Sequence, residues 1–143
     1  MGKDLMDALT TRTGDLIAVV LAAVLMVISG IDHIHLWDIA YRHVATLGPL
    51  FLVQAIAALV FAVLIVATRL VIALLASALL MVGTIGGFIL AATVGIFGFK
   101  LPEVTNYAYL ALSTEGLSTV ILVVAAARAV RTASSEAVVP TAG

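Results

Sequence analysis

Four long apolar stretches constrain the fold of this chain more than any other feature. They run from Leu16 to about Trp37, from about Pro49 to Ala67, from Leu70 to Phe97 or Phe99, and from Tyr107 to Ala127. A helix of about 20 residues crosses the ~30 Å hydrocarbon core of a bilayer. Because lipid offers no hydrogen-bond partner to an open strand, we expect helices in all four stretches. The sequence therefore predicts an all-α fold, a four-helix transmembrane bundle.

Composition supports this class and narrows the chemistry. Of the 143 residues, 64% are hydrophobic and 10% are charged, whereas charged residues make up about 25% of a soluble domain. A formal net charge of −1 offers no basic surface for nucleic acid. The chain has no cysteine, which excludes disulfides, thiol catalysis and cysteine-ligated metal sites. We expect a protein embedded in the lipid bilayer, with no nucleic-acid partner.

The distribution of Lys and Arg predicts the orientation in the membrane. Of the seven, two lie between the first and second or the third and fourth stretches, and the others share the opposite side: Lys3, Arg12, Arg69, Arg128 and Arg131. Since positive residues are retained on the cytoplasmic side, we expect an N-in/C-in protein of the plasma membrane. The first stretch precedes no small-residue cleavage motif and is expected to stay as an anchor. Residues 1–131 would then form the transmembrane domain, and residues 132–143 a disordered cytoplasmic tail.

Small residues recur every four positions in the third stretch, at Gly83, Gly87, Ala91 and Gly95. A stripe of this kind lets a neighbouring helix backbone approach closely. We interpret it as a packing face for the second or fourth helix. The alternative is the seam of a homodimer.

Polar residues at membrane depth predict a buried patch in the outer half of the bundle. Glu115 lies about eight residues, or roughly 12 Å, inside the fourth stretch. The other three helices contribute Asp32 and His33, Gln54, and Thr93. An acid at such depth costs on the order of 2.5 to 3.5 kcal/mol on insertion scales unless it is paired, protonated or hydrated. We therefore expect Glu115 to face the bundle interior, within reach of Gln54 or of Asp32 and His33.

The residue types leave three roles open for Glu115. It could be a neutral, hydrogen-bonded acid that joins helices, an acid that carries a proton or binds a ligand, or a contact for a partner subunit. The sequence leaves its protonation state open. Gln54 alone is typical of a hydrogen bond between helices.

All three histidines lie in one segment, SGIDHIHLWDIAYRHVAT, residues 29–46. His33 and His35 are two residues apart and point roughly 200° from each other on a helix, so they do not form a metal pair there. Asp38 and Arg42 have the i, i+4 spacing of a surface ion pair on a helix that continues past the membrane surface. We expect these residues to anchor the chain at the interface, with no zinc or copper site and no cofactor.

Several short motifs resemble those of a known family. HLW and YRH, then GPLFLVQAIAALV, and later GIFGFK followed by STEGLS, are similar to a family of small four-helix integral membrane proteins common in actinobacteria. The resemblance covers nearly the whole chain, from the first helix to the end of the fourth. It implies the four-helix architecture and adds no catalytic residue, substrate or cofactor.

The predicted function is non-enzymatic, because the sequence has no nucleophile–base pair, phosphate loop or metal motif. We expect a small accessory or assembly subunit that packs against a larger membrane protein or a second copy. The alternative is a small-molecule or proton-coupled carrier that uses Glu115 and Gln54, although no proline breaks any of the four stretches as is usual in carriers. Haem or quinone binding is a third function, and it requires His33 in the bundle interior.

Overall fold

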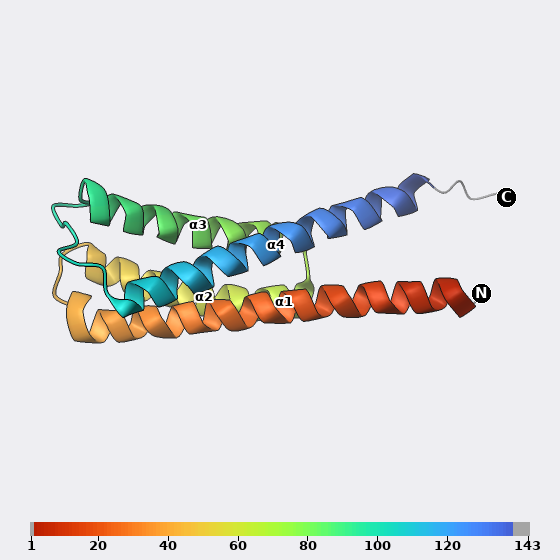
Figure 1. Cartoon of the computed structure of the whole chain (residues 1–143), viewed down its shortest axis with the longest axis horizontal. Coiled ribbons are helices and arrows are strands. Elements are labelled where there is room, and N and C mark those ends of the chain that lie inside the picture. The colour runs from red at the N-terminus through yellow and green to blue at the C-terminus, as the bar shows by residue number, and fades with distance from the viewer. Residues whose placement is uncertain (1, 139–143) are drawn as a thin grey trace.

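The computed structural model describes residues 2–138, and they form four α-helices in sequence order (Figure 1). These are α1 (Gly2–Leu36), α2 (Leu47–Thr68), α3 (Val71–Thr93) and α4 (Asn106–Val138). Helix α1 continues into a π-helical segment, Trp37–Tyr41. Each of the four helices contains an apolar stretch long enough to cross a membrane, and the described residues contain no β-strand. The predicted all-α fold with four helices of spanning length is confirmed.

Two helix boundaries differ from the prediction. Helix α3 ends at Thr93 rather than near Phe99, because Gly95 adopts a left-handed conformation (φ 92°) and its N–H donates to Leu90 O at 2.7 Å. A left-handed glycine just past the last turn is a common helix stop. Helix α4 continues through residues 132–138, for which the sequence predicts disorder. Residues 139–143 of that predicted tail lie outside the described residues.

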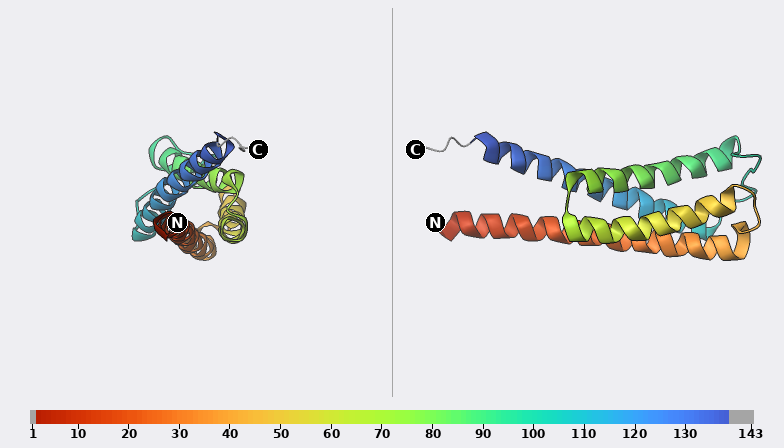
Figure 2. Two further views of the ribbon diagram at one scale, coloured as in Figure 1. Left: turned by 90° about the vertical axis from the view of Figure 1, so that its right-hand side faces the viewer. Right: turned by 180° about the vertical axis from the view of Figure 1, so that it is seen from behind.

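The helices pack side by side around a square (Figure 2). Helix α1 lies between α2 and α4, and α3 completes the square beside α4 and α2. The first residues of α1 and the last residues of α4 lie at one end of the bundle, here called the termini end. Residues 37–46 and 94–105 lie together at the other, the loop end. Helices α2 and α3 are joined toward the termini end by only Arg69 and Leu70.

The hydrophobic core lies in the part of the bundle nearer this short connection, which we call the closed half. In the closed half, the core takes buried residues from positions 58–65 of α2 and 73–81 of α3, and half of these buried residues are alanines. Such small side chains allow helix backbones to approach closely where no water drives association. Helices α1 and α4 add Met26 and Leu122, both fully buried. All the buried residues of α3 lie in this half.

The remaining part of the bundle, toward the loop end, is called the open half. Here α1 and α2 still meet closely, since a Cβ on Gly30 would lie 3.2 Å from Ala55 O. The start of α2 is also close to the π-helical segment, because a Cβ on Gly48 would lie 2.6 Å from Tyr41 O. Helix α3 behaves differently. A Cβ on Gly83 or Gly87 would meet no described atom within 4 Å.

The predicted stripe on α3 therefore does not pack against a second helix. Gly83, Gly87 and Ala91 line a cavity instead, because α3 stands away from α2 in the open half. Gly95 lies beyond α3 and serves as its stop. The homodimer seam stays a prediction.

Candidate functional site

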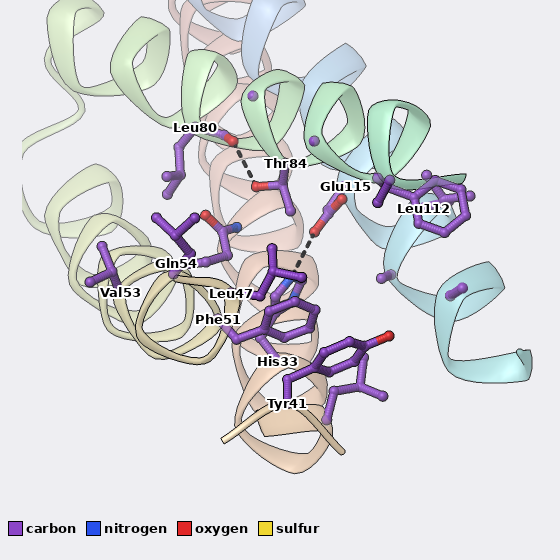
Figure 3. A pocket seen from close by; sticks show the side chains of 18 of the residues that line it. His33, Tyr41, Leu47, Phe51, Val53, Gln54, Leu80, Thr84, Leu112 and Glu115 are labelled. Atoms are coloured by element: carbon purple, nitrogen blue, oxygen red, sulfur yellow. Dashed lines mark hydrogen bonds and ion pairs between the residues drawn. The ribbon is translucent and has the colours of Figure 1, made fainter. Parts of the chain in front are cut away.

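A cavity of about 730 Å³ lies between α2 and α3, mostly in the open half, and extends to Phe61 and Ala76 of the closed half (Figure 3). Its walls are mostly aliphatic and aromatic side chains from all four helices. Three side chains with a nitrogen or carboxyl group reach it from three different helices: His33 of α1, Gln54 of α2 and Glu115 of α4. The hydroxyl of Thr84 lies on the wall formed by α3. The cavity is thus apolar over most of its wall and carries a small polar region.

The cavity opens to the outside of the bundle between exposed apolar side chains of α2 and α3. The rim residues Val53 of α2 and Leu79 of α3 have 61% and 72% of their surface exposed. At the loop end, Tyr41 stacks on Phe51 with ring centroids 4.3 Å apart and meets the edge of Phe99 at 5.7 Å. These three rings form that end of the cavity wall.

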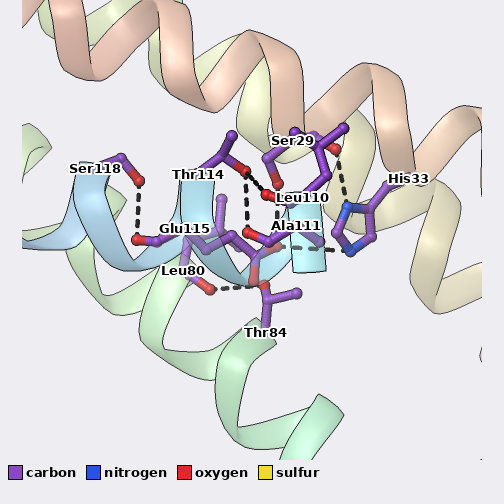
Figure 4. A network of polar contacts seen from close by, with 9 residues as sticks. All are labelled: Ser29, His33, Leu80, Thr84, Leu110, Ala111, Thr114, Glu115 and Ser118. Carbon is purple, nitrogen blue, oxygen red and sulfur yellow. Dashed lines mark hydrogen bonds and ion pairs between the residues drawn. The ribbon is translucent and has the colours of Figure 1, made fainter. Parts of the chain in front are cut away.

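The polar region is organised around Glu115, whose side chain is 1% exposed (Figure 4). Ser29 Oγ of α1 donates a hydrogen bond to Glu115 Oε1 at 3.0 Å. His33 Nε2 lies 3.8 Å from the same oxygen, close enough for electrostatic contact but beyond hydrogen-bond length. Ser29 and His33 are four residues apart on α1 and so share the face turned toward α4.

The proton position on His33 follows from a second contact. His33 Nδ1 lies 2.9 Å from the backbone oxygen of Ser29. A carbonyl oxygen only accepts, so Nδ1 carries a proton and donates it there. Nε2 is then the ring atom that faces Glu115. At the edge of the cavity, the imidazole and the carboxyl group therefore face each other without a direct hydrogen bond.

Two buried polar atoms find no hydrogen-bond partner among the described residues. They are Gln54 Nε2 and Asp32 Oδ2. Buried polar groups are paired in the large majority of cases, so each such atom calls for an explanation. Gln54 lines the cavity, whereas Asp32 does not.

The structure brings most of the predicted patch together. His33, Gln54 and Glu115 line one cavity, and Asp32 is buried on α1 beside His33. Thr93 does not join them: its side chain is exposed and its hydroxyl donates to Ile89 O at 2.6 Å. The reason is that α3 ends at Thr93, so this residue does not reach the depth that a longer helix would give it.

Sequence reasoning missed Ser29 and the aromatic wall. Ser29 could have been found from its i, i+4 spacing to His33, which puts both on one helix face. The other hydroxyls near Glu115 serve their own helix, since Ser118 Oγ and Thr119 Oγ1 donate to Glu115 O at 3.0 and 2.7 Å.

The other two histidines lie away from the cavity. His35 packs on Tyr107 with ring centroids 5.0 Å apart, and His43 Nε2 accepts a hydrogen bond from Arg42 Nε at 3.1 Å. In the part of the chain that the structure describes, no three His, Asp or Glu side chains gather as a metal site requires. The predicted Asp38–Arg42 surface ion pair is confirmed, at 3.2 Å.

Comparisons with protein-family models, with curated proteins and with solved structures found no match to this chain. The resemblance to the actinobacterial family therefore stays a prediction, and the function rests on the geometry of the cavity.

Proposed function

We propose that this is a small, non-enzymatic, multi-pass membrane protein that binds a membrane-soluble small molecule between α2 and α3. The observation that carries the proposal is the cavity of about 730 Å³ with His33, Gln54 and Glu115 on its wall. Ligand pockets typically enclose roughly 300 to 1,000 Å³ and combine an apolar wall with a few placed polar groups. The cavity fits both descriptions.

The size of the cavity favours a small molecule over a partner helix. A spanning helix about 30 Å long and 10 Å wide fills on the order of 2,000 Å³. The cavity holds about 730 Å³. A whole helix would need α2 and α3 to separate, whereas a small molecule does not.

The rim indicates how such a molecule would reach the cavity. The exposed apolar rim, Leu50 and Val53 on α2 and Leu79 on α3, would face the acyl chains of the bilayer. A ligand dissolved in the membrane could therefore move sideways into the cavity without crossing water. No Lys or Arg occurs among the described residues that line it, so nothing there would attract an anionic head group.

We further propose that both chain ends are cytoplasmic and that the cavity lies in the outer half of a plasma membrane. The Lys/Arg bias of the sequence supports this orientation. Arg128 and Asp15, whose side chains pair at 3.6 Å, lie toward the termini end and would mark the inner boundary of the spans.

Cysteine accessibility in intact cells tests the orientation. Thr105→Cys should react with a membrane-impermeant thiol reagent added from outside, and Thr141→Cys should react only after the cells are opened. Labelling of Thr141→Cys from outside would contradict the proposed orientation.

A role as an accessory or assembly subunit stands beside ligand binding as a second candidate. It is favoured by Gly83, which is exposed on α3. A Cβ at this position would have no described atom within 4 Å, so a side chain of a partner could approach the helix there. A homodimer would use the same opening.

Filling the cavity separates these functions. We expect Gly87→Leu to place a side chain in the cavity, since Gly87 lines it and nothing described lies within 4 Å of its Cβ position. Gly86→Leu is the matched control: it is equally uncrowded, but Gly86 does not line the cavity. Both proteins would be purified in mild detergent, and their organic extracts and co-purifying proteins compared by mass spectrometry.

The wild type and Gly86→Leu should retain a small molecule that Gly87→Leu loses at least tenfold, with all three equally stable to heat. Equal amounts of that molecule in Gly87→Leu, or none in the wild type, would contradict ligand binding. A co-purifying membrane protein lost only from Gly87→Leu would support the accessory role instead.

A further inference from the structure

We infer that the ligand is a neutral ring compound with a carbonyl oxygen, of the membrane-quinone type, held by a hydrogen bond from Gln54 beside Glu115 and His33. The inference rests on the proposed function, because it concerns the occupant of the same cavity. It is carried by the unpaired amide of Gln54, the aromatic wall and the charge of the lining.

The amide of Gln54 points to an acceptor on the ligand. An amide nitrogen can only donate, and Gln54 Nε2 is buried with no acceptor among the described residues. It lies on the cavity wall, in view of Leu80 and Thr84 across the space (Figure 3). The hydroxyl of Thr84 is turned to its own helix, donating to Leu80 O at 2.9 Å. A carbonyl oxygen in the cavity would complete the hydrogen bonding of Gln54.

Glu115 and His33 offer a second polar contact of a different kind. Glu115 Oε1 and His33 Nε2 lie 3.8 Å apart, so neither fills the hydrogen-bonding capacity of the other. A carboxyl group beside an imidazole can donate to a carbonyl or accept from a hydroxyl. The pair is therefore suited to a ring that carries either group, as the oxidised and reduced forms of a quinone do.

The aromatic wall favours a flat ring over a saturated chain. Of the eight Phe and Tyr residues in the chain, five line the cavity: Tyr41, Phe51, Phe61, Phe88 and Phe99. The Tyr41–Phe51 stack continues toward the polar region, since Phe51 lies 5.2 Å from the ring of His33. Offset and edge contacts between aromatic rings add to the gain from apolar burial. A ring seated on this stack would bring its carbonyl to the polar region.

The charge of the lining favours a neutral head group. An anionic lipid or fatty acid would meet Glu115 with no Lys or Arg on the described wall to offset it. An organic cation has no acceptor to offer, so it would leave the buried Gln54 donor unpaired. A neutral group with an acceptor oxygen would accept the hydrogen bond of the Gln54 amide and would not be repelled by Glu115. An alkyl or isoprenoid tail would leave past Val53 and Leu79 into the bilayer.

Binding of decylubiquinone to the full-length protein in lipid nanodiscs tests this inference. Oleic acid and tetraphenylphosphonium serve as the anionic and cationic probes. We expect decylubiquinone to bind, with Gln54→Leu raising its Kd about fivefold, the loss typical of one neutral hydrogen bond. Phe51→Leu should also weaken binding, and Thr93→Val, which alters a hydroxyl away from the cavity, should leave the Kd unchanged. If Gln54→Leu does not fold, Gln54→Met removes the same donor from an unbranched side chain of similar length.

The outcomes distinguish failure of the inference from failure of the proposed function. Binding of oleic acid or tetraphenylphosphonium, abolished by Gly87→Leu, together with no binding of decylubiquinone, would overturn the ligand class and leave the cavity as a binding site. Decylubiquinone that binds the wild type, Gln54→Leu and Gly87→Leu equally has only dissolved in the lipid, and that result would also overturn the inference. If no probe binds and no molecule co-purifies, both proposals fail.

Discussion

The closed and open halves of the bundle differ in what their small residues do. In the closed half, Ala58 and Ala62 of α2 are buried in the hydrophobic core, together with residues of α1, α3 and α4. In the open half, Gly83 and Gly87 of α3 face the cavity and meet no second helix. A small residue thus permits close packing but does not enforce it.

Polar groups follow the same division. The closed half contains one fully buried polar side chain of α3, Ser77, and its hydroxyl donates to Ala73 O of its own helix at 2.8 Å. In the open half, Ser29, His33 and Glu115 depend on contacts between α1 and α4. In the open half, polar atoms therefore remain available to a ligand, whereas in the closed half the Ser77 hydroxyl bonds within its own helix.

The largest effect is expected from overfilling the closed half. Ala62→Leu, at a residue 3% exposed, should lower the free energy of unfolding by about 2 kcal/mol, since extra methylenes in a packed interior force neighbours apart. Val63→Leu, at the next residue and 70% exposed, is the control. Both would be compared by SDS titration in mixed micelles. Equal stability of the two variants would mean that the closed half is not tightly packed.

Removal of the acid from the open half should come next. Glu115→Leu leaves the Ser29 hydroxyl without its acceptor and His33 without its polar neighbour, which should cost about 1 to 2 kcal/mol of unfolding free energy. Glu115→Gln keeps an oxygen for Ser29 and should lose less than half of that. A loss for Glu115→Gln as large as for Glu115→Leu would show that the charge, and not the hydrogen bond, holds α1 to α4.

A smaller effect should separate the two kinds of glycine. Gly30→Ala puts a Cβ 3.2 Å from the backbone oxygen of Ala55, so α1 and α2 must shift slightly, and we expect a loss of about 1 kcal/mol. Gly83→Ala meets no described atom within 4 Å and should be neutral or slightly stabilising, because alanine favours the helix. The order of the two melting temperatures checks this. Gly83→Ala as the less stable variant would indicate that α3 packs against something at this position, as a homodimer seam would require.

The smallest effect is expected at Thr93. Thr93→Val removes a hydroxyl that bonds only to Ile89 O of the same helix, so unfolding free energy should change by less than about 0.5 kcal/mol. Retention of any co-purified small molecule would be measured in parallel. A clear loss of that molecule would return Thr93 to the site.

The sequence is sufficient to predict the helices and the depth of Glu115, because apolar length decides both. It is not sufficient to predict the spacing between helices. Helix α2 is apolar on every face, so its pattern does not show which face meets α3. The four-residue spacing indicates a packing role for Gly95, and only its left-handed φ of 92° reveals a helix stop. The misplacement of Thr93 follows from that one interpretation.

The residues that line the cavity could not be predicted from the sequence, because they come from separate segments of the chain. Its histidine, amide and carboxyl groups come from α1, α2 and α4, and its aromatic wall adds residues of α3 and of the segment before Lys100. No local pattern connects these segments. Only the arrangement of the helices shows that Gln54 and Glu115 share a cavity while Asp32, next to His33 in the chain, does not line it.

The short connection between α2 and α3 is the point about which the angle between the two helices would change. Arg69 adopts a left-handed conformation (φ 51°), and the Thr68 hydroxyl accepts a hydrogen bond from the N–H of Leu70 at 3.3 Å, so the pivot is compact. Helix α2 is held against α1, whereas α3, which stands away from α2, has 23 residues and is about 35 Å long. A change of roughly 5° at the pivot therefore moves its far tip by about 3 Å. A small change of angle at Arg69 and Leu70 would therefore alter the width of the cavity, far from the polar atoms on its wall.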